Sequence, residues 1–303
     1  MEFHFLPIFA FLSLALVAIH AALTPEAYWK SVLPNTPMPK AIMDLLHPGK
    51  RKAGVGTNID IDISNIVRYY EAASDNEDQF HDTTNVVAYF LENDMKPGMT
   101  MNLHFTKSKN AATFLPRQVV ESIPFSSNKM QQILDHFSVK TYSTEADIMK
   151  QIIELCEKPG IEGEEKYCAT SLESIIDFST SKLGNYNNVQ AIATMVEKET
   201  AQVEKYYSIA GAKMVGEDAV VCHKQNYEYA VFYCHKTRAT KEYMVSLVGT
   251  GDGTKAKAVA ICHTDTSQWD PKNLAFQWLK VKPGNTLPIC HFLNEDDIVW
   301  IAN

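Results

Sequence analysis

The sequence predicts an α+β protein in which a helical hairpin precedes an antiparallel β-sheet domain. Three observations support this class. Apolar residues recur at helical spacing between residues 144 and 183. Short segments rich in β-branched and aromatic residues follow from about residue 212, and turn sequences such as GTGDGTK and KPGN separate them. Four Cys-His pairs also occur in this half of the chain.

The N-terminus contains the one stretch that is apolar enough to concern a membrane, Phe5 to Ile19. It is shorter than the roughly 20 residues that span a bilayer, and the small residues Ala21 and Ala22 follow it. We therefore expect residues 1–22 to be a signal peptide, and the mature protein to be exported without a membrane anchor. The opening MEFH carries Glu2 and no basic residue, so a buried N-terminal helix is the alternative.

Residues 23–88 are expected to form a pro-region or linker. Prolines at positions 34, 37 and 39 oppose helix and central strand and favour extended structure. Ile59, Ile61 and Ile63 alternate as they would in one short strand, and a polar segment follows. This region cannot build a core alone, although it could dock on the globular domain expected over residues 89–303.

Two helices are predicted before the sheet. Thr144 is the expected N-cap of the first, with Asp147 three residues later. The second is predicted over residues 165–183, with Gly184 as its C-cap. The breaker Pro159-Gly160 would fold the two helices into a hairpin. That arrangement brings Cys156 into bridging range of Cys168, so we predict a disulfide between them.

Five strands are then predicted, over residues 219–223, 227–235, 242–249, 257–263 and 274–281. The glycines at 249, 251 and 253 are interpreted as a hairpin turn, because no helix follows them as it would in a nucleotide-binding loop. The acidic runs at residues 75–78 and 295–297 are interpreted as solvated surface.

The most informative feature is a dipeptide that occurs four times, as Cys222-His223, Cys234-His235, Cys262-His263 and Cys290-His291, with gaps of 10, 26 and 26 residues. Adjacent residues on a strand point to opposite faces, so the cysteines and the histidines should separate. In an oxidising compartment the cysteines would form disulfides and leave four imidazoles as metal donors. Nitrogen donors suit Cu(II) or Zn(II), and Cu(II) binds more tightly at equal availability.

Two other interpretations of the pairs remain. A structural Cys₂His₂ zinc site requires thiolates and usually CxxC or HxxxH spacing, which the sequence lacks. The pairs could also be a repeated disulfide scaffold with incidental histidines. The formal charge of -8 opposes binding to nucleic acid. No P-loop, GxSxG or HExxH motif is present, and the catalytic residues, if any, are unknown.

At this point the sequence resembles the plant BURP-domain proteins. Its four Cys-His pairs, at residues 222–291, match the spacing of that family in full. The stretch YFLENDMKPGMTMNLHF at residues 89–105 is similar to the usual opening of the domain. Cys156 and Cys168 resemble the two additional cysteines of the domain. The segment TPEAYWKSVLPNTPMPKAI resembles BURP precursors. The dehydration-responsive and unknown-seed-protein subgroups are the two candidates, although the TxV repeats typical of the former are missing.

The resemblance implies secretion to the apoplast, cell wall or vacuole, a link to stress or seed development, and copper as cofactor. By position, His223, His235, His263 and His291 would be the ligands. Some members are copper- and oxygen-dependent peptide cyclases that join a Trp or Tyr to another residue of a core peptide. Here the only tryptophan of the pro-region, Trp29, lies in the family-like YWKSVLPN segment, and no Gln-initiated core that ends in Trp is present. Tyr69 and Tyr70 would be the Tyr-type acceptors, but nothing repeats or brackets them, so self-cyclisation is disfavoured. A non-catalytic, wall-interacting or regulatory subunit is the third possibility, so a cell-wall component or a peptide is the expected partner.

Overall fold

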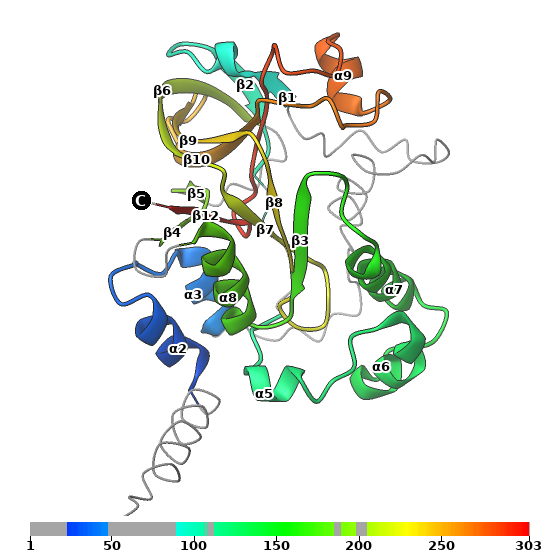
Figure 1. The fold of residues 1–303 in the computed structure, drawn as a ribbon. Coiled ribbons are helices and arrows are strands. Elements are labelled where there is room, and N and C mark those ends of the chain that lie inside the picture. The colour runs from blue at the N-terminus through cyan, green and yellow to red at the C-terminus, as the bar shows by residue number, and fades with distance from the viewer. Residues whose placement is uncertain are drawn as a thin grey trace, which may run out of the picture.

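A computed structural model of the chain describes residues 23–47, 89–105, 107, 112–184, 189–197 and 205–302. Two antiparallel sheets, with helices around them, make up the fold (Figure 1), so the α+β class is confirmed. Sheet A runs in the order β1 (Tyr89–Leu91), β11 (Ile289–Phe292), β10 (Lys255–His263), β9 (Thr240–Gly249), β6 (Lys205–Glu217) and β2 (Thr100–Leu103), and β5 (Met195–Val196) also pairs with β10. Sheet B runs in the order β3 (Glu164–Ala169), β8 (Phe232–Thr237), β7 (Val220–Lys224), β12 (Ile298–Ala302) and β4 (Val189–Ile192).

The helices lie in three places. The described helices are α2 (Pro25–Val32), α3 (Lys40–Leu46), α5 (Arg117–Val120), α6 (Met130–Phe137), α7 (Thr144–Glu157), α8 (Leu172–Leu183) and α9 (Leu274–Leu279), with 3₁₀ turns at Glu92–Asp94 and Ser127–Lys129. Helices α2, α3 and α8 lie together beside sheet B, α6 and α7 form a separate lobe, and α9 lies near β1 and sheet A (Figure 1). Within the described residues, no helix is long and apolar enough to cross a membrane. The apolar stretch at residues 5–19 lies outside them.

The predicted helical hairpin is wrong in its second arm. The first helix forms as α7, but its N-cap is Ser143, whose hydroxyl accepts from the amide of Ala146, and Thr144 is the first helical residue. Residues 164–169 form strand β3, which pairs with β8, and α8 begins only at Leu172, where the N-cap Ser171 forms a capping box with Ser174 of the first turn. The partner strand satisfies the backbone groups that a longer helix would have used, and the capping box fixes where the helix starts.

Two other segments also differ from the sequence prediction. Residues 274–281, predicted as a strand, contain the short helix α9, because the Asn273 side chain caps it by accepting from the amide of Ala275. Residues 227–231 precede β8 rather than forming its start. Their side chains Tyr227 and Tyr229 are buried among α6 and α7. The turn predicted at residues 249–253 is confirmed, since it joins the antiparallel strands β9 and β10.

The N-terminal segment is also more ordered than expected. Extended structure was predicted around the three prolines, but α2 ends before Pro34 and α3 begins after Pro39. The prolines therefore sit in the turn between two helices, where their missing amide hydrogens cost little. The strand predicted at Ile59, Ile61 and Ile63 lies outside the described residues.

The two sheets pack against each other through a small apolar cluster. Its members come from both sheets and are Ala219, Val221, Val259, Ile261, Leu293, Val299 and Ile301. Val221 lies two residues before His223 on β7, and Ile261 lies two residues before His263 on β10. Because side chains two apart on a strand share a face, these histidines point into the space between the sheets.

Candidate functional site

The four Cys-His pairs form the same local arrangement twice, once in each sheet. In sheet B, Cys222 of β7 lies directly opposite Cys234 of β8, and the two form a disulfide. In sheet A, Cys262 of β10 lies opposite Cys290 of β11 and is bonded to it. With Cys156–Cys168, the predicted pair, all six cysteines of the chain are in disulfides.

The register of each strand pair brings two imidazoles together. In an antiparallel pair with cysteine opposite cysteine, the next residue on each strand lies on the other face, and the two are diagonal neighbours. His223 and His235 meet in this way, and their Nε2 atoms are 3.2 Å apart. The rings of His263 and His291 stack with their centroids 5.6 Å apart. The sulfurs lie behind them, in two different cores.

Three of the four imidazoles have a fixed orientation. The Nδ1 atom of His235 lies 2.8 Å from Oε1 of Glu164, and Nδ1 of His223 lies 3.3 Å from Oδ2 of Asp297. The Nδ1 atom of His291 lies 3.4 Å from the carbonyl of Phe292. An acceptor beside Nδ1 keeps the ring proton on Nδ1 and leaves the lone pair of Nε2 free to bind a metal ion. This is the usual arrangement around metal-binding histidines.

Burial keeps the rings of His223, His263 and His291 neutral. Desolvation, followed by the charges of the neighbouring histidines, lowers the pKa of His223 and His263 well below 6.5. The same causes lower the pKa of His291 to about 4. The histidines of sheet B act on those of sheet A, because both His223 and His235 contribute to the shift of His263. The two pairs therefore lie within electrostatic reach of each other.

The carboxylates beside the histidines also have displaced pKa values. Burial raises the pKa of Asp297 to about 7. For Glu164 burial acts in the same direction, but the hydrogen bond and charge of His235 outweigh it and lower the pKa. Tyr233, whose hydroxyl donates to Glu164 at 3.1 Å, lies with its ring 5.4 Å from that of His235. Glu164 thus fixes His235 from a strand outside the Cys-His motif.

Copper is the metal that the resemblance implies, and the donors fit it only in part. Neutral imidazoles suit Cu(II), and 3.2 Å between two Nε2 atoms lies within the ~2.8–3.4 Å expected for two nitrogens about 2.0–2.1 Å from one ion. However, in the part of the chain that the structure describes, no three His, Cys, Asp or Glu side chains are grouped closely enough to hold a metal ion. The structure brings together two histidine pairs rather than a closed four-ligand site.

Sequence reasoning missed several residues next to the histidines. Asp297 was interpreted as solvated surface, but both it and Asp296 are buried. Only its position directly before the apolar strand β12 could have indicated this. Glu164 had no sequence signal, because its contact with His235 depends on the pairing of β3 with β8. Two aromatic rings flank the sheet A pair, with Trp269 4.9 Å from His263 and Tyr89 6.1 Å from His291.

The candidate acceptors for cyclisation are not displayed near the histidines. Trp29 is 3% exposed, and its Nε1 donates to the carbonyl of Thr36 at 3.0 Å. Its ring packs 5.5 Å from that of Trp300 in the core between α2 and sheet B. Tyr69 and Tyr70 lie outside the described residues. Trp29 is therefore a core residue, which opposes its use as a cross-linking substrate.

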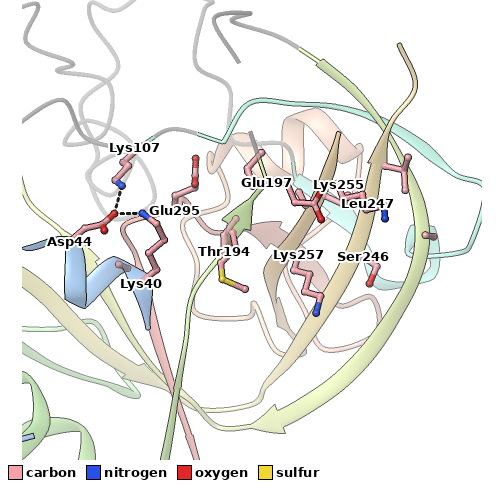
Figure 2. A pocket seen from close by; sticks show the side chains of 16 residues that line it. Lys40, Asp44, Lys107, Thr194, Glu197, Ser246, Leu247, Lys255, Lys257 and Glu295 are labelled. Carbon is pink, nitrogen blue, oxygen red and sulfur yellow. Dashed lines mark hydrogen bonds and ion pairs between the residues drawn. The ribbon is translucent and has the colours of Figure 1, made fainter. Parts of the chain in front are cut away.

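A separate cavity of about 770 Å³ lies between α3 and sheet A (Figure 2). Its wall is mostly apolar and carries lysines and carboxylates of opposite charge, including an ion-paired group in which Lys40 and Lys107 both contact Asp44. None of the four histidines lines it. The cavity is thus distinct from the space between the sheets.

Comparisons with known proteins identify the family of the chain. The BURP domain family pattern matches residues 88–302. The chain is 38% identical to BURP domain protein RD22 of Arabidopsis thaliana, over 96% of this chain and 97% of the relative. It is 41% identical to BURP domain-containing protein 5 of Oryza sativa, over 93% of this chain and 88% of the relative. It is 33% identical to unknown seed protein USP of Vicia faba, over 100% of this chain and 97% of the relative. The chain therefore belongs to the BURP-domain family of plant proteins.

Proposed function

We propose that this BURP-domain protein binds copper through His223, His235, His263 and His291, in the space between its two sheets. The observation that carries the proposal is the pairing of two largely buried imidazoles in each sheet, with three of the four Nδ1 atoms next to acceptors. Bound copper would supply a redox-active Lewis acid. The chain's own contribution is to hold the four imidazoles in place and to keep His223, His263 and His291 neutral by burial.

The cysteines have a structural role in this proposal. Each disulfide lies across its strand pair, behind the histidines, and fixes the register that places two imidazoles side by side. A one-residue slip would turn each histidine to the opposite face. The thiolates needed for a Cys₂His₂ zinc site are not available while the cysteines are bonded to each other.

The proposal is tested by titrating the purified protein with Cu(II) in a calorimeter. We expect one site per chain, and a loss of at least about tenfold in affinity when any one of the four histidines is replaced by alanine, because each ligand supplies a metal bond. His136→Ala is the matched control, since His136 is an exposed histidine on α6. The disulfide count, measured by mass under non-reducing conditions, should remain three in every variant.

Binding that survives all four substitutions would overturn the imidazole site. Binding that disappears only when the cysteines are removed would favour a thiolate site instead. A result in which His223 and His235 matter but His263 and His291 do not would reduce the site to the sheet B pair.

We also propose that the protein is exported, to the apoplast, cell wall or vacuole, with a role in stress or seed development. The apolar N-terminus and the complete pairing of the cysteines support export. The similarity to a seed protein of Vicia faba supports the physiological setting. N-terminal sequencing of the protein secreted by cultured plant cells should give a first residue near position 22. A mature protein that begins at Met1 would contradict the signal peptide.

A further inference from the structure

Helices α2 and α3 form a compact pair with its own internal contacts. The Thr24 hydroxyl accepts from the amide of Ala27 and caps α2. Three prolines lie in the turn that follows, and the Nε1 of Trp29 donates across this turn to the carbonyl of Thr36. The exposed His47 contacts Glu26 at 3.3 Å, which ties the end of the segment back to its beginning. Residues 24–47 therefore form one local unit with hydrogen bonds and an ion pair of its own.

This helical pair, residues 24–47, covers an apolar face of the family domain. Trp29, Leu33, Ala41 and Ile42 are all buried, and Ile42 is fully buried. They pack into one core with Trp300 of β12 and with residues of α8 and β4. That core also contains the Cys222–Cys234 disulfide, which lies directly behind the sheet B histidines. The helical pair therefore shares with α8 the covering of this face of sheet B.

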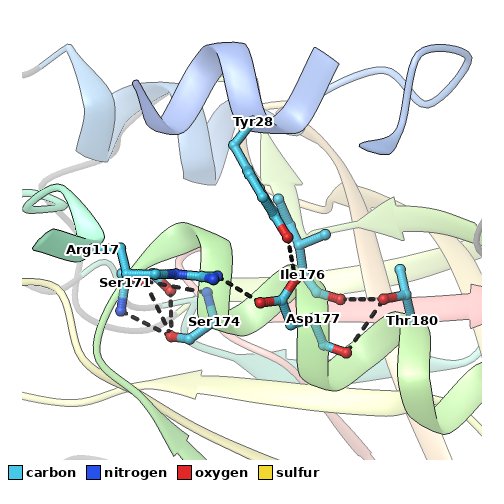
Figure 3. A network of polar contacts seen from close by, with 7 residues as sticks. All are labelled: Tyr28, Arg117, Ser171, Ser174, Ile176, Asp177 and Thr180. Atoms are coloured by element: carbon cyan, nitrogen blue, oxygen red, sulfur yellow. Dashed lines mark hydrogen bonds and ion pairs between the residues drawn. The ribbon is translucent and has the colours of Figure 1, made fainter. Parts of the chain in front are cut away.

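Polar contacts surround the apolar centre and reach several elements of the domain. The Tyr28 hydroxyl donates to Asp177 of α8, and Arg117 of α5 contacts the other oxygen of the same carboxylate at 2.6 Å (Figure 3). The Thr36 hydroxyl donates to the carbonyl of Val189 at 2.6 Å. Farther along, the amide of Phe114 donates to the carbonyl of Leu45 at 3.2 Å. A buried aromatic centre within a polar rim is the usual form of a specific protein interface.

None of these contacts is covalent. No cysteine precedes Cys156, so no disulfide can join the helical pair to the domain. The two are connected only through residues 48–88, and the matched family domain begins at residue 88. The basic run Lys50-Arg51-Lys52 lies in that connection, and proteases specific for basic residues cut at such runs.

We propose that residues 24–47 are a permanent part of the folded protein and remain bound to the domain as a separate chain when the connection is cut between residues 48 and 88. The domain's partner is then a short helical pair with a tryptophan at its centre, supplied by the same precursor. Processing would yield a two-chain protein rather than a domain freed from its pro-region.

The test uses the full chain with a site-specific protease sequence, flanked by Gly and Ser, inserted after Gly56. After complete cleavage, judged on a denaturing gel, the sample is passed through a size-exclusion column in native buffer. The N-terminal fragment should elute with the domain in a one-to-one ratio by intact mass, and should separate from it in concentrated urea. Elution of the fragment apart from the domain in native buffer would overturn the proposal.

A pair of variants on the same helix identifies the anchor. Trp29→Ala removes the buried ring, and we expect at least about tenfold less fragment to stay with the domain, because large buried aromatics dominate such interfaces. Lys30→Ala changes an exposed neighbour and should retain the fragment as the unchanged chain does. Equal retention of the Trp29→Ala fragment would refute the assigned anchor. The cleavage of the unchanged chain decides the main proposal even if Trp29→Ala folds poorly.

Discussion

The carboxyl pair formed by Glu228 and Glu145 should make the stability of this protein depend on pH. Glu228 lies between the buried side chains Tyr227 and Tyr229, and is itself half-buried against Glu145 in the first turn of α7. Burial, then the hydrogen bond and charge of Glu145, raise the pKa of Glu228 from 4.5 to about 7. Glu228 is therefore more easily protonated in the folded protein than in the unfolded chain.

The sign and size of the effect follow from this shift. Below pH 4.5 the group is protonated in both states, and its stabilising contribution is fully present. As the pH rises through 7, that contribution is lost, because the folded protein must accept a second carboxylate beside Glu145. A rise from 4.5 to about 7 corresponds to roughly 3 kcal/mol at full burial. Solvent screening of this half-buried side chain reduces it to roughly 1–2 kcal/mol.

The assay is urea unfolding of the unchanged chain and of Glu228→Gln between pH 4.5 and 8, with the disulfides intact. Glutamine stays neutral, so the variant should match the unchanged chain at pH 4.5 and exceed its stability by roughly 1–2 kcal/mol at pH 8. Glu154→Gln changes a partly exposed glutamate on α7, the helix that carries Glu145, and should show no comparable pH-dependent gain in stability. If Glu228→Gln is no more stable at pH 8, or gains equally at pH 4.5, the reasoning is refuted.

Three further outcomes are expected. Replacing the Cys156–Cys168 bridge by two serines should lower the free energy of unfolding by about 3 kcal/mol in urea, because it opens a loop with a sequence separation of 12. Glu164→Gln should weaken Cu(II) binding about 10- to 100-fold, because Glu164 orients His235. The adjacent variant Glu165→Gln, in which the changed residue pairs with Lys182, should leave the Cu(II) affinity unchanged. Equal losses of affinity in the two variants would contradict the orienting role of Glu164. Gly216→Ala should lower the free energy of unfolding by about 1–3 kcal/mol in the same urea assay, because an added Cβ would lie 2.9 Å from a methyl carbon of Ile301. Gly211→Ala on the same strand is the control, since its Cβ would meet nothing within 4 Å. Similar losses of stability in the two variants would contradict this packing.

Local geometry explains how much of the site could be predicted. In each Cys-His pair, the cysteine and the following histidine point to opposite faces because side chains alternate along a strand, which is a property of the extended backbone. For that reason the sequence was sufficient to expect sulfurs and imidazoles on different faces. The first helix and the hairpin turn at residues 249–253 were predictable for the same reason, since capping residues and turn glycines act within a few positions of themselves.

The remainder depended on contacts between distant segments. Residues 165–169 have acceptable helical composition, but pairing with β8 makes them a strand, and this pairing also brings Glu164 to His235. The burial of Asp297 beside His223 likewise required the packing of β12 against β7. Such pairings are set by the free energy of the whole sheet, which no local pattern contains.

The sequence by itself determined the α+β class and the separation of the cysteine and histidine side chains, because both follow from local residue patterns and local backbone geometry. The family was indicated by the resemblance of the four Cys-His pairs and the flanking segments to BURP-domain proteins. Only the tertiary structure decided how the four cysteines of the Cys-His pairs are joined, that the histidines form one pair in each sheet, and that the tryptophan of the N-terminal segment is part of the core. Cys222 meets Cys234, and Cys262 meets Cys290, because antiparallel register places each directly opposite its partner. That register is fixed by the burial of both sheets against their neighbours, which involves residues far apart in the chain.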